Sequence, residues 1–353
     1  MLKDSLFLVV MAGGSGTRFW PKSTSKKPKQ FLAFGNSSDS LLQQTMKRFE
    51  KMVPESRTNR MIVTTEFLRG EVLKQFSEGS MTLLAEPSGR NTAPCVFWAA
   101  QEVVRTNPNG IMLVMPSDHY IHDLKAFAVS IEDAIKHAES TDDLVTLGVK
   151  PTRPETGYGY LKTGVPITKN CFKVDAFVEK PNHERAEEFL KSGAYLWNGG
   201  MFVWKARAVL DAFSKFMPEM NRAWGEAKGN VTAAYPNLTA TSIDFGVMER
   251  ASNVVTFPLD CGWDDLGSWT SLETLAETLG AVSNSGTVTA GNVITVDSSG
   301  NIVDVPGHLV ALLGVKDLVV VRQGDTILIA DKHRAQDIRL VVEQVKKVAP
   351  EKA

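Results

Sequence analysis

The feature that most constrains this chain is an apolar run that leads directly into a glycine cluster near its start. Leu6–Met11 are all apolar, and the stretch AGGSGTR follows at residues 12–18. An unbroken apolar run of this length is typical of a strand buried on both faces. The glycines predict a tight turn after that strand, because glycine adopts backbone conformations that other residues resist. Five cations stand in or just after the turn: Arg18, Lys22, Lys26, Lys27 and Lys29.

A glycine turn with this many cations predicts a phosphate site. Exposed backbone N–H groups cradle phosphate oxygens, and basic side chains neutralise their charge. The dinucleotide fingerprint G-x-G-x-x-G fails here because Phe19 takes the place of its last glycine, which argues against an NAD(P)-dependent oxidoreductase. The P-loop fails because no Lys-Ser or Lys-Thr pair closes the turn. A plain strand-to-helix turn with solvated lysines is the other interpretation, and the density of cations favours phosphate.

Further apolar runs and helical patterns alternate along the first three quarters of the chain. Strands are predicted at Met61–Thr65, Ile111–Met115, Leu144–Leu147, Phe177–Val178 and Met201–Trp204, and helices at Leu41–Met52, Phe127–His137 and Glu184–Lys191. Strands that alternate with helices predict an α/β fold with a doubly wound, parallel or mixed sheet. In such sheets, ligands bind where the carboxyl ends of the strands meet the following loops.

The character of the sequence changes at about Ala281. Short β segments separated by Ser-Gly, Pro-Gly and Gly-Asp turns replace the helical pattern, which predicts a small β domain or a partial β-helix. We therefore expect a catalytic domain at residues 1–280 and a structural or assembly domain at residues 281–353. The tail His333–Val348 is predicted to be helical, with an apolar face that packs on the β domain or on a second subunit, so we expect a homodimer. That face consists of Ile338, Val341, Val342, Val345 and Val348.

Composition excludes some classes of protein. The 353 residues carry a formal net charge of −1, so the chain is not built to coat nucleic acid or an anionic membrane. The three cysteines are far apart and form no CxxC pair, which indicates a reducing, cytoplasmic setting without a disulfide framework. The apolar run at the start is too short for a membrane span, and we expect no targeting segment.

Seven motifs in order give the chain a resemblance to a known family. The opening stretch AGGSGTRFWPKSTSKKPKQF resembles the signature of the sugar-nucleotide pyrophosphorylases, and its FWP…KPKQF form is similar to the mannose-1-phosphate guanylyltransferases. The other six are EPSGRNTAP (86–94), MPSDH (115–119), PTRPETGYGYL (151–161), VEKP (178–181), WNGGMF (197–202) and WDDLGSW (263–269). The resemblance implies a Rossmann-like, GT-A-like nucleotidyltransferase fold. It also implies that GTP and mannose 1-phosphate react to give GDP-mannose and pyrophosphate, with Mg²⁺ as cofactor.

The resemblance assigns the phosphates and the metal to the loops that follow the strands. The glycine turn would cradle the nucleotide through Ala12, Gly13, Gly14, Gly16 and Thr17. Arg18 would hold the β- and γ-phosphates, and Lys29 would lie near the α-phosphate. Mg²⁺ prefers oxygen ligands, and Asp118 and Asp265 would supply them. Asp264 is the alternative to Asp265, and we expect it to be structural. A metal pair of His119 and His122 is not expected, because a hard metal needs no imidazole.

Base and sugar recognition fall to later motifs. Glu86 can accept from N1–H and the amino group of guanine, a donor pair that adenine lacks, and Asn91 and Thr92 would complete the base pocket. For the hexose, the resemblance implies a backbone approach at Gly159, hydroxyl contacts from Glu179 and Asn198, and a phosphate contact from Lys180.

Two alternatives stay open at this level. An enzyme with another base or hexose specificity would share most of these motifs. A catalytically silent sugar-nucleotide sensor is disfavoured by the presence of Arg18, Lys29, Asp118 and Asp265. Phosphomannose isomerase activity, which some longer relatives add through a histidine-rich module, is not expected. Phe19 stands where the family usually has leucine, and we expect that change to alter packing of the loop and not its ligands.

Overall fold

The structure is a computed structural model, and it describes residues 5–14, 16–34, 37–52, 58–77, 79–278 and 286–353. The chain divides into two compact units. The sheet unit comprises Met1–Gly13, Met46–Ser117 and Asp123–Trp263, and the loop unit comprises Gly14–Thr45, Asp118–His122 and Asp264–Ala353. The predicted domain boundary at residues 280 and 281 lies outside the described residues. No helix in the described part of the chain is long and apolar enough to cross a membrane.

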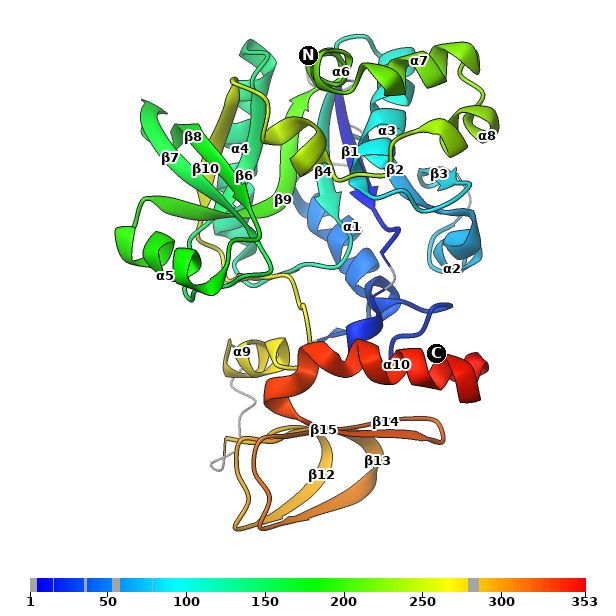
Figure 1. The fold of residues 1–353 in the computed structure, drawn as a ribbon, viewed down its shortest axis with the longest axis vertical. Coiled ribbons are helices and arrows are strands. Elements are labelled where there is room, and N and C mark those ends of the chain that lie inside the picture. Colours follow the sequence, from blue (N-terminus) through cyan, green and yellow to red (C-terminus); the bar gives the residue numbers. More distant parts are fainter. Residues whose placement is uncertain (1–4, 15, 35–36, 53–57, 78, 279–285) are drawn as a thin grey trace. The chain divides into compact units, whose positions relative to one another are not determined.

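The sheet unit is built on a nine-stranded mixed sheet, which confirms the predicted fold class (Figure 1). The strand order is β3-β2-β1-β4-β9-β6-β10-β8-β7. The neighbours from β3 to β4 run parallel, β9 is antiparallel to β4 and β6, and β10 runs parallel to β6. The strands are β1 Leu6–Met11, β2 Thr58–Thr65, β3 Thr82–Glu86, β4 Ile111–Pro116, β6 Leu144–Val149, β7 Gly159–Thr168, β8 Cys171–Glu179, β9 Tyr195–Lys205 and β10 Val254–Leu259.

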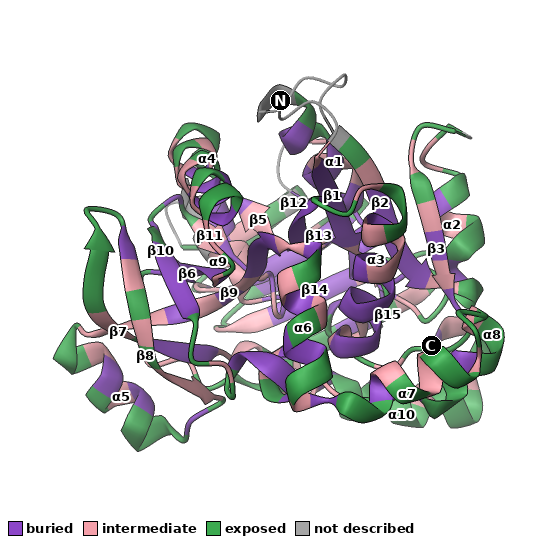
Figure 2. Ribbon diagram, turned by 90° about the horizontal axis from the view of Figure 1, so that it is seen from above, coloured by how far each residue is buried: buried purple, intermediate pink, exposed green. Residues whose placement is uncertain are grey.

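The strand predictions hold best where a strand is buried on both faces. β1 has the predicted bounds and is almost wholly buried (Figure 2). β4 is buried except at its last residue. β8 is much longer than the predicted Phe177–Val178. Its first residues were not predicted, because charged residues such as Lys173 and Asp175 interrupt the apolar run. β3, β7 and β10 were not predicted, and most of β7 is exposed or half-buried, so it carries little apolar signal.

Helices cover this sheet and share its core. Residues of α3 and α6 lie in one buried cluster with β1, β4 and β9, and that cluster includes Phe97, Phe202 and Phe213. α3 was not predicted, while the predicted helices at α1, α4 and α5 are confirmed with small extensions. The helices are α1 Leu41–Met52, α2 Arg69–Leu73, α3 Thr92–Thr106, α4 Leu124–Ser140, α5 His183–Ser192, α6 Ala206–Phe216, α7 Pro218–Glu226 and α8 Val231–Ala234, with 3₁₀ turns at Glu66–Leu68 and Tyr235–Asn237 and a π-helix at Asp244–Met248.

The loop unit combines the glycine turn with the C-terminal β segments. Its four-stranded sheet has the order β12-β13-β14-β15, with the first three strands parallel and the last pair antiparallel. The elements are η1 Thr17–Phe19, η2 Lys29–Phe31, β5 Tyr120–Ile121, α9 Ser271–Thr278, β12 Val288–Val296, β13 Ile302–Leu313, β14 Leu318–Gln323, β15 Thr326–Asp331, η7 Lys332–Asp337, α10 Ile338–Val348 and η8 Pro350–Lys352; β11 Trp263–Asp264 ends in this unit.

One aromatic cluster joins the glycine turn to the rest of the loop unit. The ring of Phe19 lies 4.9 Å from that of Phe34 and 5.0 Å from that of Trp269, centroid to centroid. Phe19 is fully buried, so the residue that departs from the usual leucine is part of this core. Aromatic pairs at such distances add to the stability given by burial of their area.

The C-terminal helix packs on the same cluster, within the loop unit. Ile338 and Val342 are each 2% exposed, and Val345 packs beside them. The predicted apolar face is wrong at two positions, because Val341 is 41% and Val348 is 83% exposed. A spacing of four and then three residues places 338, 342 and 345 on one stripe of a helix, and 341 and 348 fall beside it.

Candidate active site

The glycine turn lies directly against Lys29. Gly16 has a φ of 50°, and a Cβ atom there would stand 2.6 Å from the backbone nitrogen of Lys29, so only glycine fits. Gln30 Nε2 donates to the carbonyl oxygen of Gly14 at 3.0 Å. The turn and the start of η2 are therefore one packed structure, which positions Arg18 and Lys29 relative to each other.

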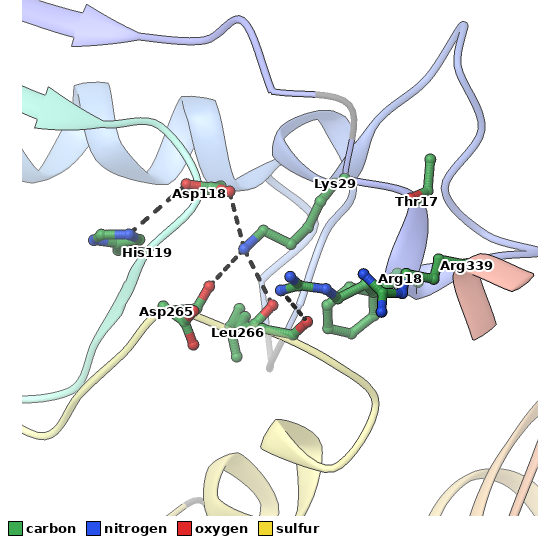
Figure 3. Close-up of a pocket in the computed structure, with 11 residues that line it drawn as sticks. Thr17, Arg18, Lys29, Asp118, His119, Asp265, Leu266 and Arg339 are labelled. Atoms are coloured by element: carbon green, nitrogen blue, oxygen red, sulfur yellow. Dashed lines mark hydrogen bonds and ion pairs between the residues drawn. The ribbon is translucent and has the colours of Figure 1, made fainter. Parts of the chain in front are cut away.

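Lys29 is a buried, fully engaged cation and not a solvated lysine. The residue is 7% exposed. Its Nζ atom forms an ion pair with Asp118 Oδ2 at 2.9 Å and donates to the backbone oxygens of Asp265 at 2.5 Å and Leu266 at 3.1 Å (Figure 3). One ammonium thus joins the loop after β4 to the WDDLGSW segment.

The Asp118 carboxyl is held in its charged form. Burial alone would raise its pKa, but the ammonium of Lys29 and the neighbouring His119 outweigh burial and lower the pKa below its usual value. The side chain is 31% exposed, so it remains accessible from the pocket described next. A charged, accessible carboxylate is the form that a divalent cation needs.

These residues line a pocket of about 360 Å³ within the loop unit. Its lining includes both predicted metal ligands, Asp118 and Asp265, and both predicted phosphate-binding cations, Arg18 and Lys29. We call it the loop pocket. Gly16, Thr17, Phe19, His119, Leu266, Gly267 and Arg339 complete its lining.

Asp264 and Asp265 occupy different environments. Asp264 is 8% exposed, and its Oδ1 atom accepts from the backbone N–H of Leu266 at 2.6 Å. Asp265 lines the loop pocket, and Asp264 does not appear in its lining. That Asp264 is structural stays a prediction, which its burial and its bond to Leu266 support. Among the described residues, no group of three or more His, Cys, Asp or Glu side chains gathers to hold a metal, so any ion would need further ligands from its substrate.

The sheet unit holds the predicted base-recognition residue at the end of β3. Glu86 is 4% exposed, and the Tyr235 hydroxyl donates to its Oε1 atom. Its Oε2 atom lies 3.3 Å from the position that a Cβ atom would take at Gly13. Burial raises the pKa of the Glu86 carboxyl to about 7, and the hydrogen bond from Tyr235 offsets this only in part. Each carboxylate oxygen can accept twice, so Glu86 retains acceptor capacity.

The other predicted nucleotide-binding residues of the sheet unit form hydrogen bonds with backbone groups of that unit. Ala12 is fully buried, and its N–H donates to Val63 O at 2.7 Å. Asn91 caps α3 by accepting from Thr92 N–H at 2.8 Å, and its φ of 67° is uncommon for a residue other than glycine. Thr92 Oγ1 accepts from the N–H of Ile243 at 2.9 Å.

The predicted hexose residues come together in the sheet unit around Gly159. A Cβ atom at Gly159 would clash with Glu179 Oε2 and stand 3.3 Å from Asn198 Cβ, so any side chain there would have to displace the Glu179 carboxylate. Lys180 pairs with Glu179 Oε1 and has a φ of 48°. Gly159, Glu179, Lys180 and Asn198 therefore form one cluster, which we call the sheet cluster.

Asp244 belongs to the sheet cluster and was missed by the sequence reasoning. Asn198 Nδ2 donates to Asp244 Oδ1 at 2.8 Å, while Thr146 Oγ1 donates to Asn198 Oδ1 at 3.0 Å. These two bonds fix the orientation of the amide and leave its second N–H available. Burial raises the pKa of Asp244 to about 6, and the charge of Glu179 adds to the rise. Asp244 opens a π-helix, a feature often found at functional sites.

Sequence reasoning had little access to the residues it missed. Asp244 and Tyr235 lie outside the seven motifs, and only the fold brings them to Asn198 and Glu86. Arg339 lies in the predicted terminal helix, where only the apolar residues carried a signal. An aspartate directly before the apolar run FGVM was the one available signal.

Comparison with known proteins agrees with this geometry. Residues 8–281 match the family described as Nucleotidyl transferase, and residues 291–345 match the MannoseP isomerase/GMP-like beta-helix domain. The chain belongs to the nucleotidyl transferase family. The loop pocket and the sheet cluster are thus sites on a nucleotidyl transferase fold, followed by a β-helix-like domain as predicted.

Individual relatives are similar over nearly the whole chain. Mannose-1-phosphate guanylyltransferase of Escherichia coli K12 is 38% identical over 98% of this chain and 74% of the relative. Xanthan biosynthesis protein XanB of Xanthomonas campestris is 38% identical over 96% of this chain and 73% of the relative. A solved structure, described as mannose-1-phosphate geranyltransferase from Thermus thermophilus, superposes with a TM-score of 0.87 at 32% identity, covering 97% of this chain and 99% of that one.

Proposed function

We propose that this nucleotidyl transferase moves GMP from GTP to α-D-mannose 1-phosphate and releases pyrophosphate. A phosphate oxygen of the sugar phosphate forms a bond to the α-phosphorus. The bond from the α-phosphorus to the bridging oxygen breaks, and pyrophosphate leaves with that electron pair. The observation that carries the proposal is the loop pocket, where Lys29 joins Asp118 to the backbone of Asp265 beside the glycine turn.

The cations of the loop pocket suit the charges that develop in this reaction. Lys29 is fixed by three partners, so its positive charge is held in place near the α-phosphate, and a direct hydrogen bond to phosphate would replace one of those partners. Among the residues that the structure describes, the Arg18 guanidinium donates to Gly267 O alone, at 3.4 Å, which leaves most of its donors for the β- and γ-phosphates. Positioning and electrostatic stabilisation carry most of the catalysis in phosphoryl-type transfers.

Two carboxylates of the same pocket fit a divalent cation. Asp118 and Asp265 are hard oxygen donors, and magnesium usually takes one or two protein carboxylates plus substrate phosphates. We propose Mg²⁺ in this role; when bound, it would neutralise charge on the phosphate oxygens as the leaving group departs. Asp118 would exchange part of its interaction with Lys29 for the metal.

The sheet unit would supply specificity. Glu86 would accept from guanine N1–H and the amino group, with Asn91 and Thr92 beside it, and adenine would offer this buried carboxylate no such donor pair. In the sheet cluster, the free N–H of Asn198 would donate to a sugar hydroxyl and Glu179 would accept from another. Lys180 would meet the sugar phosphate, and Gly159 would let the backbone approach the ring.

A coupled assay of pyrophosphate release tests the activity. It combines GTP, ATP, UTP and dTTP with mannose 1-phosphate and glucose 1-phosphate, in magnesium and in EDTA. We expect turnover that is highest for GTP with mannose 1-phosphate and is lost in EDTA. Faster turnover with UTP or dTTP would favour the alternative specificity, and no turnover with any pair would favour a sugar-nucleotide sensor.

The quaternary structure and the role of the C-terminal domain are proposals of their own. We propose a homodimer, which light scattering of the purified chain would test directly. We also propose that residues 281–353 support folding or assembly, because buried residues of that segment, such as Ile302 and Val319, share a cluster with Phe19.

A further inference from the structure

The C-terminal helix is fixed against the glycine turn inside the loop unit. Ile338 and Val342 anchor α10 in the cluster that contains Phe19 and Trp20. Trp20 Nε1 also donates to the backbone oxygen of Lys352 at 2.8 Å, just beyond that helix. Burial and a directional hydrogen bond together define where α10 lies relative to the turn, so its exposed side chains have defined positions.

Arg339 follows the anchor Ile338 and lines the loop pocket (Figure 3). It stands there with Arg18 and Lys29, although more than 300 residues separate it from both in the chain. No ion pair joins Arg18 or Arg339 to a carboxylate within the described ranges, whereas Lys29 is paired with Asp118. Two guanidinium groups with unused donors therefore face the same pocket.

The place of Arg339 in the loop pocket is electrostatically unfavourable. It is the second residue of α10, which continues the 3₁₀ helix η7, and its guanidinium faces the pocket that also holds the guanidinium of Arg18. Two cations in one pocket repel each other. That cost disappears when a polyanion binds, because guanidinium groups bind phosphate oxygens through paired, charge-assisted hydrogen bonds.

We propose that Arg339 is a substrate-binding residue that holds the terminal phosphates of the nucleotide, and the departing pyrophosphate, together with Arg18. The inference rests on the proposed function and extends it, because it makes the C-terminal helix part of the triphosphate site. Removal of that segment would then damage catalysis directly, and not only assembly.

Pyrophosphate binding tests the proposal without turnover. Isothermal titration with magnesium pyrophosphate would compare the wild type with Arg339→Ala, Arg339→Lys and the control Arg334→Ala. Arg334 is also exposed and lies in the same terminal segment, but it pairs with Asp337 at 3.0 Å outside the pocket lining. We expect Arg339→Ala to weaken pyrophosphate about tenfold or more, Arg339→Lys to weaken it less, and Arg334→Ala to bind like the wild type.

Steady-state kinetics add a second readout. Arg339→Ala should raise KM for GTP and leave KM for mannose 1-phosphate within about twofold, a split that general loss of structure would not give. The proposal would be overturned if Arg339→Ala bound pyrophosphate as tightly as the wild type. It would also be overturned if Arg334→Ala weakened binding as much as Arg339→Ala does. If Arg339→Ala melts early, the lysine variant decides the question. A wild type that binds pyrophosphate but never turns over would contradict the proposed function and leave this inference standing.

Discussion

The Asp118 carboxyl of the loop pocket and the Glu86 and Asp244 carboxyls of the sheet unit have pKa values shifted in opposite directions. In the loop pocket, the ammonium of Lys29 lowers the pKa of Asp118 and keeps that carboxylate charged. In the sheet unit, burial raises the pKa of Glu86 to about 7 and that of Asp244 to about 6. Neutral donors, the Tyr235 hydroxyl and the Asn198 amide, occupy those two carboxyls. The loop pocket therefore keeps a charged carboxylate ready at Asp118, and the sheet unit orients the carboxyls of Glu86 and Asp244 by hydrogen bonds, while the sheet cluster also contains the Lys180–Glu179 ion pair.

This difference suggests a division of labour. Full charges stabilise the charge that develops during transfer, so Lys29, Asp118 and Asp265 of the loop pocket should govern kcat, while the guanidinium groups of that pocket also hold GTP and affect its KM. Oriented hydrogen bonds in a buried setting discriminate between similar ligands, so the sheet unit should govern KM and specificity. Each of the following experiments tries to break that division.

The largest effect is expected from Asp265→Asn. Loss of a carboxylate from the loop pocket should lower kcat on the order of 100-fold or more, with a much smaller rise in KM for GTP, because metal binding matters most as charge develops. Stopped-time assays in magnesium would measure both constants. The matched variant Asp264→Ala should instead lower the melting temperature, since it removes the acceptor for Leu266 N–H. Wild-type kinetics in Asp265→Asn would remove this residue from the site.

Gly159→Ala should disturb sugar binding by displacing a partner. The new Cβ would meet Glu179 Oε2 at 2.4 Å, and that flexible carboxylate would move away. We expect KM for mannose 1-phosphate to rise by a factor on the order of 10 to 100, with KM for GTP nearly unchanged. Gly157→Ala, in the same motif, meets only Glu155 at 3.2 Å and serves as control. Equal effects of the two variants would show that the loop and not the Glu179 contact matters.

Asp244→Ala should remove the acceptor of Asn198 Nδ2, so that the amide is less firmly oriented. Loss of one hydrogen bond to a charged group, worth roughly 1.5 kcal/mol, would raise KM for mannose 1-phosphate about tenfold and leave kcat near its wild-type value. Asp244→Asn keeps an acceptor for Asn198 Nδ2 and should therefore lose less. If both variants bind the sugar phosphate like the wild type, Asp244 does not orient Asn198.

The raised pKa of Glu86 predicts a pH dependence. Below pH 7 the carboxyl is protonated and loses acceptor capacity, so KM for GTP should rise up to about tenfold per pH unit as the pH falls from 7 to 6. The folded state also holds this proton more tightly than the unfolded chain, whose value is 4.5. Folding stability relative to Glu86→Gln should therefore fall as the pH rises from 4.5 to 7. KM titrations and melts of both proteins check this, and parallel profiles would refute it.

The sequence predicted the parts of this protein that depend on local pattern. β1 ends where expected, and the loop pocket unites Arg18, Lys29, Asp118 and Asp265, because each follows a recognisable motif. β7 could not be predicted, since its exposed outer half shows no apolar alternation. Asp244 and Arg339 could not be predicted either, because their partners are distant in the chain.

The most direct test of the division of labour measures base discrimination and kcat in the same set of variants. The ratio of kcat/KM for GTP to that for ATP would be measured for the wild type, Glu86→Gln and Asp265→Asn, with mannose 1-phosphate saturating. The account predicts that Glu86→Gln lowers this ratio while kcat with GTP stays within a fewfold of wild type, and that Asp265→Asn lowers kcat while the ratio is kept. A wild-type ratio in Glu86→Gln, or a collapsed ratio in Asp265→Asn, would contradict it.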